Sequence, residues 1–117
     1  MKILIVDDDK AILRVLARTL KDHNLTAVTT AAEGIERVFQ SEQKFDVVIS
    51  DYEIGKENGL VMLANIREIS PETKFILMTG SAGEFCGEKN NFLAGFLRKP
   101  FEINEIRELL KKLQGGN

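Results

Sequence analysis

Four short apolar runs in this chain are each followed by a polar residue, and this pattern restricts the possible folds more than any other feature. The runs occupy residues 3–6, 47–50, 75–78 and 95–97. Asp7, Asp51 and Thr79 directly follow the first three, and Lys99 stands two residues after the end of the fourth. Short, continuous apolar runs are typical of strands that are buried on both faces of a parallel sheet. Because the carboxyl ends of parallel strands share one edge, where ligands bind, these polar side chains are predicted to converge on one small site.

The segments between the runs have the spacing of amphipathic helices, so the chain is predicted to repeat strand and then helix. Helices are predicted at 10–22, 32–40, 59–69 and 103–113, with Asp9 and Asn58 as N-caps of the first and third. Strands are predicted at 25–29, 46–50, 74–78 and 95–98, besides the first apolar run. The apolar helix residues expected to face the core are Ile12, Leu13, Leu16, Ala17, Leu20, Ile35, Val38, Phe39, Leu60, Leu63, Ile66, Ile106, Leu109, Leu110 and Leu113.

The region between Thr79 and Gly95 breaks this regular pattern. It is rich in glycine and asparagine, which are unfavourable in a helix interior. The residues concerned are Gly80, Gly83, Gly87, Asn90 and Asn91. Segment 81–91 is therefore predicted to be short, irregular or mobile rather than a full helix.

Length and composition predict one globular domain that spans residues 1–117. The net charge of −2 gives no broad electrostatic basis for binding nucleic acid. The single cysteine excludes an internal disulfide. No apolar stretch approaches the roughly 20 residues of a membrane span, and the first apolar run is too short for a signal peptide. The expected location is the cytoplasm.

The chemistry of the predicted site follows from three carboxylates that lie close together, those of Asp7, Asp8 and Asp51. Their mutual repulsion would raise their pKa values unless a cation joins them. Mg²⁺ prefers oxygen ligands and commonly combines a few carboxylates with water and a substrate phosphate. A carboxylate can also attack phosphorus and form an aspartyl phosphate. A nearby hydroxyl and ammonium, here Thr79 and Lys99, could bind the phosphate oxygens.

In this order and at these spacings, the motifs resemble the receiver domain of two-component response regulators, in particular the chemotaxis-regulator-like members. The matching residues are Asp7-Asp8 after the first strand, Asp51, Thr79 and Lys99-Pro100, and Asn58-Gly59 also fits. The resemblance extends from residue 2 to about residue 113. It implies a doubly wound, flavodoxin-like α/β fold with a five-stranded parallel sheet in the order 2-1-3-4-5. It also implies five helices, of which the fourth is here expected to be irregular or shortened.

The resemblance assigns the acidic residues to phosphorylation and metal binding. Asp51 matches the phosphoacceptor, Asp8 a direct metal ligand, and Asp7 a ligand that often acts through water. The main-chain carbonyl of Glu53 matches a further metal ligand. The implied metal is Mg²⁺, with Mn²⁺ as an alternative.

Other residues match positions that bind phosphate, switch conformation or set the lifetime of the phosphate. Thr79 and Lys99 match the phosphate-binding pair, and the bond between Lys99 and Pro100 is expected to be cis. Phe96 occupies the position of an aromatic switch residue. Glu53 and Ser81 match the positions that flank the attacking water and are expected to tune phosphate lifetime.

The implied function is a phosphoacceptor switch that assists its own phosphorylation and dephosphorylation and is not otherwise an enzyme. The phosphoryl donor would be a sensor histidine kinase or a phosphotransfer protein. An output domain, a target protein or a second copy would bind the face formed by the fourth helix, fifth strand and fifth helix. No direct nucleic acid binding by this domain and no membrane partner are expected.

Two alternatives remain open at this point. Haloacid-dehalogenase-like phosphatases also combine a strand-end Asp with Thr or Ser, Lys and Mg²⁺, but normally carry a second Asp two residues later, where this chain has Glu53. The other alternative is a receiver-like interaction module that functions without phosphate.

Overall fold

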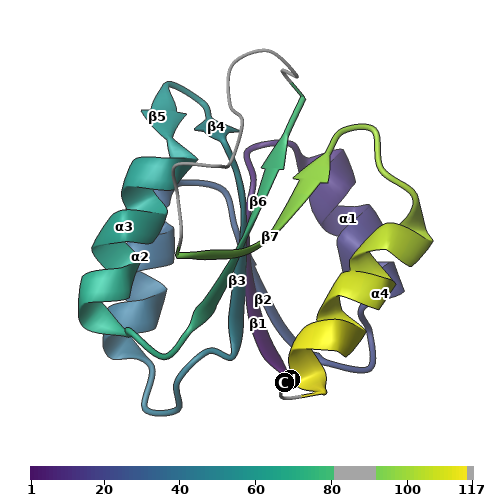
Figure 1. Cartoon of the computed structure of the whole chain (residues 1–117). Helices are drawn as coiled ribbons and strands as arrows, with labels where there is room; N and C mark the ends of the chain where they lie inside the picture. The colour runs from purple at the N-terminus through teal and green to yellow at the C-terminus, as the bar shows by residue number, and fades with distance from the viewer. Residues whose placement is uncertain (81–91, 116–117) are drawn as a thin grey trace.

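A five-stranded parallel sheet forms the centre of the computed structural model, which describes residues 1–80 and 92–115 (Figure 1). Its strands are β1 (Lys2–Val6), β2 (Asn24–Val28), β3 (Val47–Asp51), β6 (Lys74–Thr79) and β7 (Leu93–Arg98). They are ordered β2-β1-β3-β6-β7, and all neighbouring pairs are parallel. This is the predicted order 2-1-3-4-5, with β6 and β7 as fourth and fifth strands. A small antiparallel hairpin, β4 (Glu53–Ile54) and β5 (Glu57–Asn58), stands apart from the sheet.

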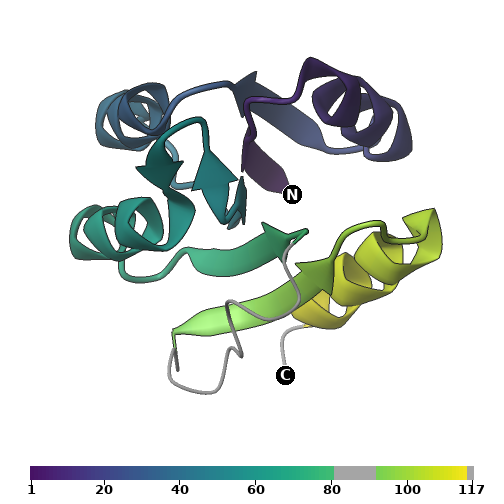
Figure 2. The same cartoon turned by 90° about the horizontal axis from the view of Figure 1, so that it is seen from above.

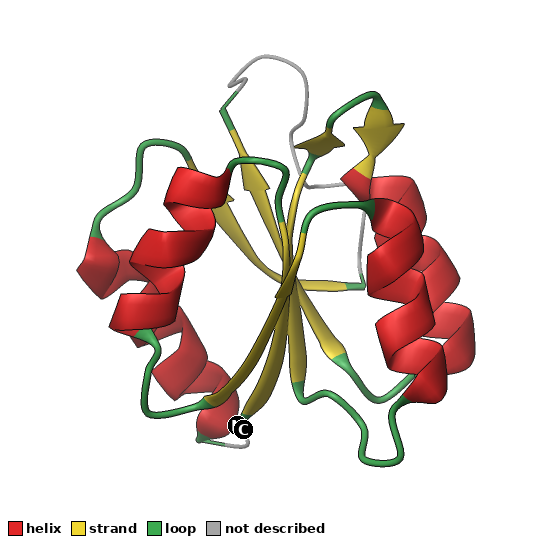
Figure 3. Ribbon diagram, turned by 180° about the vertical axis from the view of Figure 1, so that it is seen from behind, coloured by secondary structure: helices red, strands yellow, loops and turns green. Residues whose placement is uncertain are grey.

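Helices cover both faces of the sheet, as in a doubly wound fold (Figures 1 and 2). The helices α1 (Lys10–Thr19) and α4 (Ile103–Gln114) lie on one face, and α2 (Ala31–Gln40) and α3 (Gly59–Ile69) on the other (Figure 3). The described residues contain four helices where five were predicted. The predicted fourth helix falls in segment 81–91, which lies outside the described residues. The prediction that this segment is irregular concerns the same residues and stays a prediction.

Alternate residues of the central strands supply two separate apolar cores. On β1, Leu4 and Val6 pack toward α2 and α3, whereas Ile3 and Ile5 pack toward α1 and α4. These four residues are completely buried. Burial on both faces explains why the strands appear in the sequence as continuous apolar runs instead of alternating ones.

Local signals place the starts of two helices that border the site. The Asp9 carboxylate accepts a hydrogen bond from Ala11 N at 2.9 Å, and the Asn58 side chain accepts from Leu60 N at 2.8 Å. Both predicted N-caps are therefore confirmed. The helix α1 ends at Thr19, before its predicted end at residue 22, because Leu20 leaves the helical conformation at φ −108° and ψ 25°.

Two residues predicted to face the core do not. Phe39 is 75% exposed, and Ala17 is also exposed. In α2 the buried stripe is formed by Ala31, Gly34 and Val38. Phe39 follows Val38 by one residue, about 100° around the helix, and so lies beside the stripe. Ala17 likewise follows the buried Leu16 by one residue and lies to the side of it on α1.

None of the helices in residues 1–80 and 92–115 has both the length and the apolar character that a membrane crossing requires.

Candidate functional site

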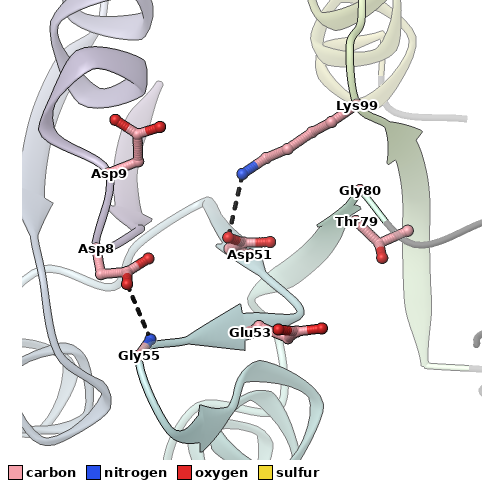
Figure 4. Close-up of a pocket in the computed structure, with 8 residues that line it drawn as sticks. All are labelled: Asp8, Asp9, Asp51, Glu53, Gly55, Thr79, Gly80 and Lys99. Carbon is pink, nitrogen blue, oxygen red and sulfur yellow. Dashed lines mark hydrogen bonds and ion pairs between the residues drawn. The ribbon is translucent and has the colours of Figure 1, made fainter.

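The polar strand-end residues converge on one pocket, as predicted (Figure 4). The pocket opens at the carboxyl-terminal edge of the sheet, where β1, β3, β6 and β7 end. Its lining consists of Asp8, Asp9, Asp51, Glu53, Gly55, Thr79, Gly80 and Lys99. The parallel register explains this convergence, because β1 pairs with β3, β3 with β6, and β6 with β7, so that all four strands end at the same edge.

Lys99 bridges two of the carboxylates at the floor of the site. Its Nζ lies 3.1 Å from Asp7 Oδ2 and 3.1 Å from Asp51 Oδ2. The Asp7 side chain is fully buried, and those of Asp51 and Lys99 are 14% and 18% exposed. The main-chain N–H of Lys99 donates to Thr79 O at 2.7 Å, which holds the start of this turn against β6. The Lys99–Pro100 bond is cis, as predicted.

The ionisation of Asp7 and Lys99 reflects this arrangement. Burial raises the pKa of Asp7 above its ordinary value, even though the Asp9 N–H and the Lys99 ammonium favour its charged form. Burial alone would lower the pKa of Lys99, but its hydrogen bonds and its attraction to Asp7 and Asp51 outweigh that effect and raise it. Lys99 is therefore charged at neutral pH, and its pairing stabilises the fold until the pH rises through its raised pKa.

The carboxylates form a cluster that suits a small divalent cation. One oxygen from each of Asp7, Asp8 and Asp51 lies within 4.8 Å of the others. Asp8 is exposed, so the cluster is open to solvent on that side. One ammonium cannot balance the charge of three ionised carboxylates, so an added cation would be attracted to this cluster. Oxygen donors with an open side fit Mg²⁺, which retains water and binds phosphate oxygens.

Comparison with known proteins agrees with this geometry. A family model described as the response regulator receiver domain matches residues 3–111. The chain belongs to the response regulator receiver domain family. The chemotaxis protein CheY of Listeria monocytogenes is 30% identical over 115 residues, which cover 96% of this chain and 97% of that protein. The structure of the response regulator TrrA from Thermotoga maritima, in complex with Mg²⁺-BeF, has a TM-score of 0.84 at 28% identity and covers 97% of this chain and 99% of that one.

Other relatives carry a receiver domain as one part of a longer protein. The transcriptional regulatory protein GlrR of Escherichia coli is 33% identical over 112 residues, which cover 92% of this chain but 25% of that protein. The chain spans a quarter or less of the length of several curated relatives that it matches. Receiver domains therefore occur among these relatives with different output segments, and the family alone does not specify the output of this one.

The remaining predicted residues of the receiver domain lie at different distances from the acidic cluster. Thr79 is buried at the end of β6 and lines the pocket, and exposed Glu53 lies on its rim. Phe96 is half-buried in β7, packs against the core beneath α2 and α3, and borders a separate surface hollow with Leu109. It does not line the acidic pocket. Ser81 lies outside the described residues.

Two features of the site were not predicted. The first is the direct ion pair between Lys99 and buried Asp7, for which the prediction was only a metal ligand that often acts through water. The second is the β4–β5 hairpin, whose Gly55 N–H donates to Asp8 Oδ2 at 3.1 Å (Figure 4). A sequence signal for this hairpin exists. Gly55 and Lys56 form a two-residue turn, and glycine at the first turn position with φ 62° is typical of a type II′ hairpin turn.

The raised pKa of Asp7 predicts that a neutral side chain stabilises the metal-free receiver domain. The pKa of Asp7 is higher in the folded than in the unfolded protein, so its charged carboxylate lowers the free energy of unfolding at neutral pH. This destabilisation disappears as the pH falls through the folded-state pKa toward the ordinary value of 3.8. In EDTA at pH 7, Asp7→Asn should raise the free energy of unfolding, because it removes the buried charge while Lys99 keeps its contact with Asp51. Urea unfolding from pH 7 to pH 3.5 measures this. The exposed control Asp22→Asn should show no gain, and a destabilised Asp7→Asn variant would contradict the prediction.

Proposed function

We propose that Asp51 is the phosphoacceptor of this receiver domain and that Mg²⁺ supports its phosphorylation. Receiver domains of this family are phosphorylatable switches of two-component signalling. The observation that carries the assignment to Asp51 is the contact between its Oδ2 and the Lys99 ammonium at 3.1 Å, next to two further carboxylates and Thr79. Among these carboxylates, Asp51 is neither fully buried like Asp7 nor bonded to the hairpin like Asp8.

Each residue of the site has a separate role in phosphoryl transfer. A carboxylate oxygen of Asp51 attacks phosphorus and forms the new O–P bond. The bond from phosphorus to the donor breaks, and its electron pair leaves with the donor, which is the histidine imidazole of a kinase or the acetate of acetyl phosphate. Lys99 then has a phosphate oxygen as a new partner in place of Asp51, and the buried Thr79 hydroxyl supplies a donor beside it.

The acidic cluster would hold the metal. Asp7, Asp8 and Asp51 supply side-chain oxygens, and we include the main-chain carbonyl of Glu53 as a fourth ligand because Glu53 lies on the rim of the pocket. Bound Mg²⁺ would offset the negative charge of the three carboxylates and of the incoming phosphoryl group. Oxygen ligation of the same kind admits Mn²⁺. The Mg²⁺-BeF complex of TrrA supports this choice of metal.

Signalling from the site would use Thr79 and Phe96. Both lie on neighbouring strands at the β6–β7 edge of the sheet, where Thr79 pairs with Arg98 and Leu77 pairs with Phe96. A movement of the Thr79 hydroxyl toward phosphate would change the space available to the aromatic ring. Glu53 and Ser81 would tune the lifetime of the phosphate. An output domain, a target protein or a second copy would bind the surface around β7 and α4.

The cellular role follows from the family. Receiver domains of response regulators interact with sensor kinases, so we propose a sensor histidine kinase or a phosphotransfer protein as the donor, in the cytoplasm. We propose no nucleic acid or membrane partner for this domain. Receiver domains are typically switches and not enzymes, and no feature of the described site favours a phosphatase of the haloacid dehalogenase type over this function.

The test is a phosphorylation assay with a small phosphodonor. Incubation with acetyl phosphate and Mg²⁺ should add one phosphoryl group to the protein, as measured by intact mass spectrometry, and peptide mapping should place it at Asp51. EDTA should prevent the addition, because the carboxylate cluster would then repel the anionic donor. Labelling that is independent of metal, or that maps to another residue, would contradict the proposed function.

A further inference from the structure

The β4–β5 hairpin is bound on two sides, and the two contacts connect the acidic cluster to helix α2. On one side Gly55 N–H donates to Asp8 Oδ2 at 3.1 Å. On the other side Glu57 Oε1 accepts from Ala31 N, also at 3.1 Å. Ala31 is the first residue of α2, so Glu57 satisfies one of the main-chain donors that a helix start leaves unpaired. Between the two contacts, Ile54 is 2% exposed and packs into the core beneath α2 and α3.

The contact with Asp8 fixes the direction of a carboxylate in the cluster. Gly55 N–H occupies one oxygen of Asp8, and the other oxygen is turned toward the space next to Asp51 (Figure 4). Groups that hold one side of a ligand side chain in this way orient the ligand for a metal. The same hairpin contains Glu53, so its position also determines where the main chain of Glu53 lies at the rim of the pocket.

The hairpin depends on its anchors because it is too short to be stable alone. It contains two residue pairs, Glu53 with Asn58 and Ile54 with Glu57. Two-stranded hairpins are marginally stable in water even when longer. Glu57 lies directly opposite Ile54, next to the turn that carries Gly55. A carboxylate is also a favourable partner for the start of α2, where the helix dipole is positive.

We infer that Glu57 is a positioning residue for the metal site: by binding the first N–H of α2, it holds the hairpin so that Gly55 N–H orients Asp8 and Glu53 stays at the rim. Glu57 itself touches none of the carboxylates through any contact recorded for residues 1–80 and 92–115. This inference rests on the proposed metal site and extends it by Glu57 and by the first residue of α2, to which Glu57 is bound. The single N–H of Ala31 thereby contributes to metal affinity through its bond to Glu57.

The experiment compares Mg²⁺ affinity with fold stability in four variants of the full chain. Tyr52 adjoins Asp51 and is the single tyrosine of a chain without tryptophan, so its fluorescence can follow a Mg²⁺ titration, with calorimetry as a second readout. Glu57→Ala should weaken Mg²⁺ binding by about 3- to 10-fold, less than the roughly 10- to 100-fold typical of groups that contact a metal ligand directly. Glu57→Gln should bind nearly as the parent does, because its amide oxygen still accepts from Ala31 N.

Two controls separate positioning from a general effect on the fold. Thr30→Ala removes two bonds at the start of α2, the one that the Thr30 hydroxyl accepts from Glu33 N and the one that it donates to Glu33 Oε1, and it changes no residue of the hairpin. It should lower the urea midpoint in EDTA but leave the Mg²⁺ affinity unchanged. Lys56→Ala alters an exposed residue of the hairpin turn and should change neither quantity.

The outcomes distinguish this inference from the proposed function. Unchanged Mg²⁺ affinity in Glu57→Ala, or an equal loss in Thr30→Ala, would overturn the positioning role while leaving the metal site intact. A failure of Glu57→Gln to restore affinity would also overturn it. Failure of the parent protein itself to bind millimolar Mg²⁺ would overturn the metal site and, with it, this inference.

Discussion

Asp51→Asn should abolish phosphorylation by acetyl phosphate, because an amide oxygen is a far weaker nucleophile than a carboxylate. The side chains are nearly equal in size, and the Asn oxygen can still accept from Lys99 Nζ, so the fold should persist. The expected loss is at least about 100-fold in the initial rate of labelling, a barrier increase of about 2.7 kcal/mol or more. Intact mass spectrometry at several times after mixing gives the comparison.

The matched control for this loss is Asp46→Asn. Asp46 immediately precedes the same strand, β3, at the opposite edge of the sheet, where it accepts a hydrogen bond from Lys2 N. This variant should be labelled like the parent. If Asp51→Asn were labelled to the same extent as Asp46→Asn, a different residue would have to be the phosphoacceptor.

Gly59→Ala should destabilise the protein strongly, by about 3 kcal/mol or more, because no space exists for a methyl group at this position. A Cβ built on Gly59 would lie 1.9 Å from Asp51 O and 2.8 Å from Ser50 Oγ. The Gly59 N–H also donates to Tyr52 O at 2.7 Å, so the start of α3 cannot move away without losing that bond. Urea unfolding in EDTA measures the effect.

Gly80→Ala is the corresponding control, since it adds the same methyl group beside the same site. There, among the described residues other than the direct chain neighbour, the nearest atom to a built Cβ is Lys99 Cβ at 4.0 Å, an ordinary contact distance. This variant should retain nearly the stability of the parent. Equal stability of the Gly59 and Gly80 variants would mean that the close approach of α3 to Asp51 is not required.

Most of the fold and of the acidic site could be predicted because both depend on local signals. Strand-end residues such as Asp51 and Thr79 converge as soon as the strands are parallel, and caps such as Asn58 act within one turn of helix. The cis bond after Lys99 came from the family resemblance. The alternation of strand and helix was sufficient for the layered architecture, whereas the exact ends of α1 and β7 were not readable from periodicity.

The features that were missed depend on contacts between distant residues. Phe39 has the spacing of a core residue, but the neighbouring Val38 occupies the inward stripe of α2, and this depends on how the helix is rotated against the sheet. The ion pair between Asp7 and Lys99 joins residues 92 positions apart in the chain. The bond from Ala31 N to Glu57 joins segments 26 residues apart and has no signature in either one. Segment 81–91 lies outside the described residues, so its prediction stays a prediction.

The division of the apolar interior into two cores has a consequence for how such a domain can diverge. Residues such as Leu4 and Ile5 are neighbours in sequence but belong to different cores, separated by the thickness of one sheet. Substitutions in distant, non-contacting sets of side chains are usually additive. Each half can therefore accumulate changes without compensation from the other, provided that the strand register is kept. The register also keeps the carboxylates at the carboxyl-terminal edge of the sheet in place. Related proteins can therefore change their helix surfaces, and with them their partners, while the acidic site stays the same.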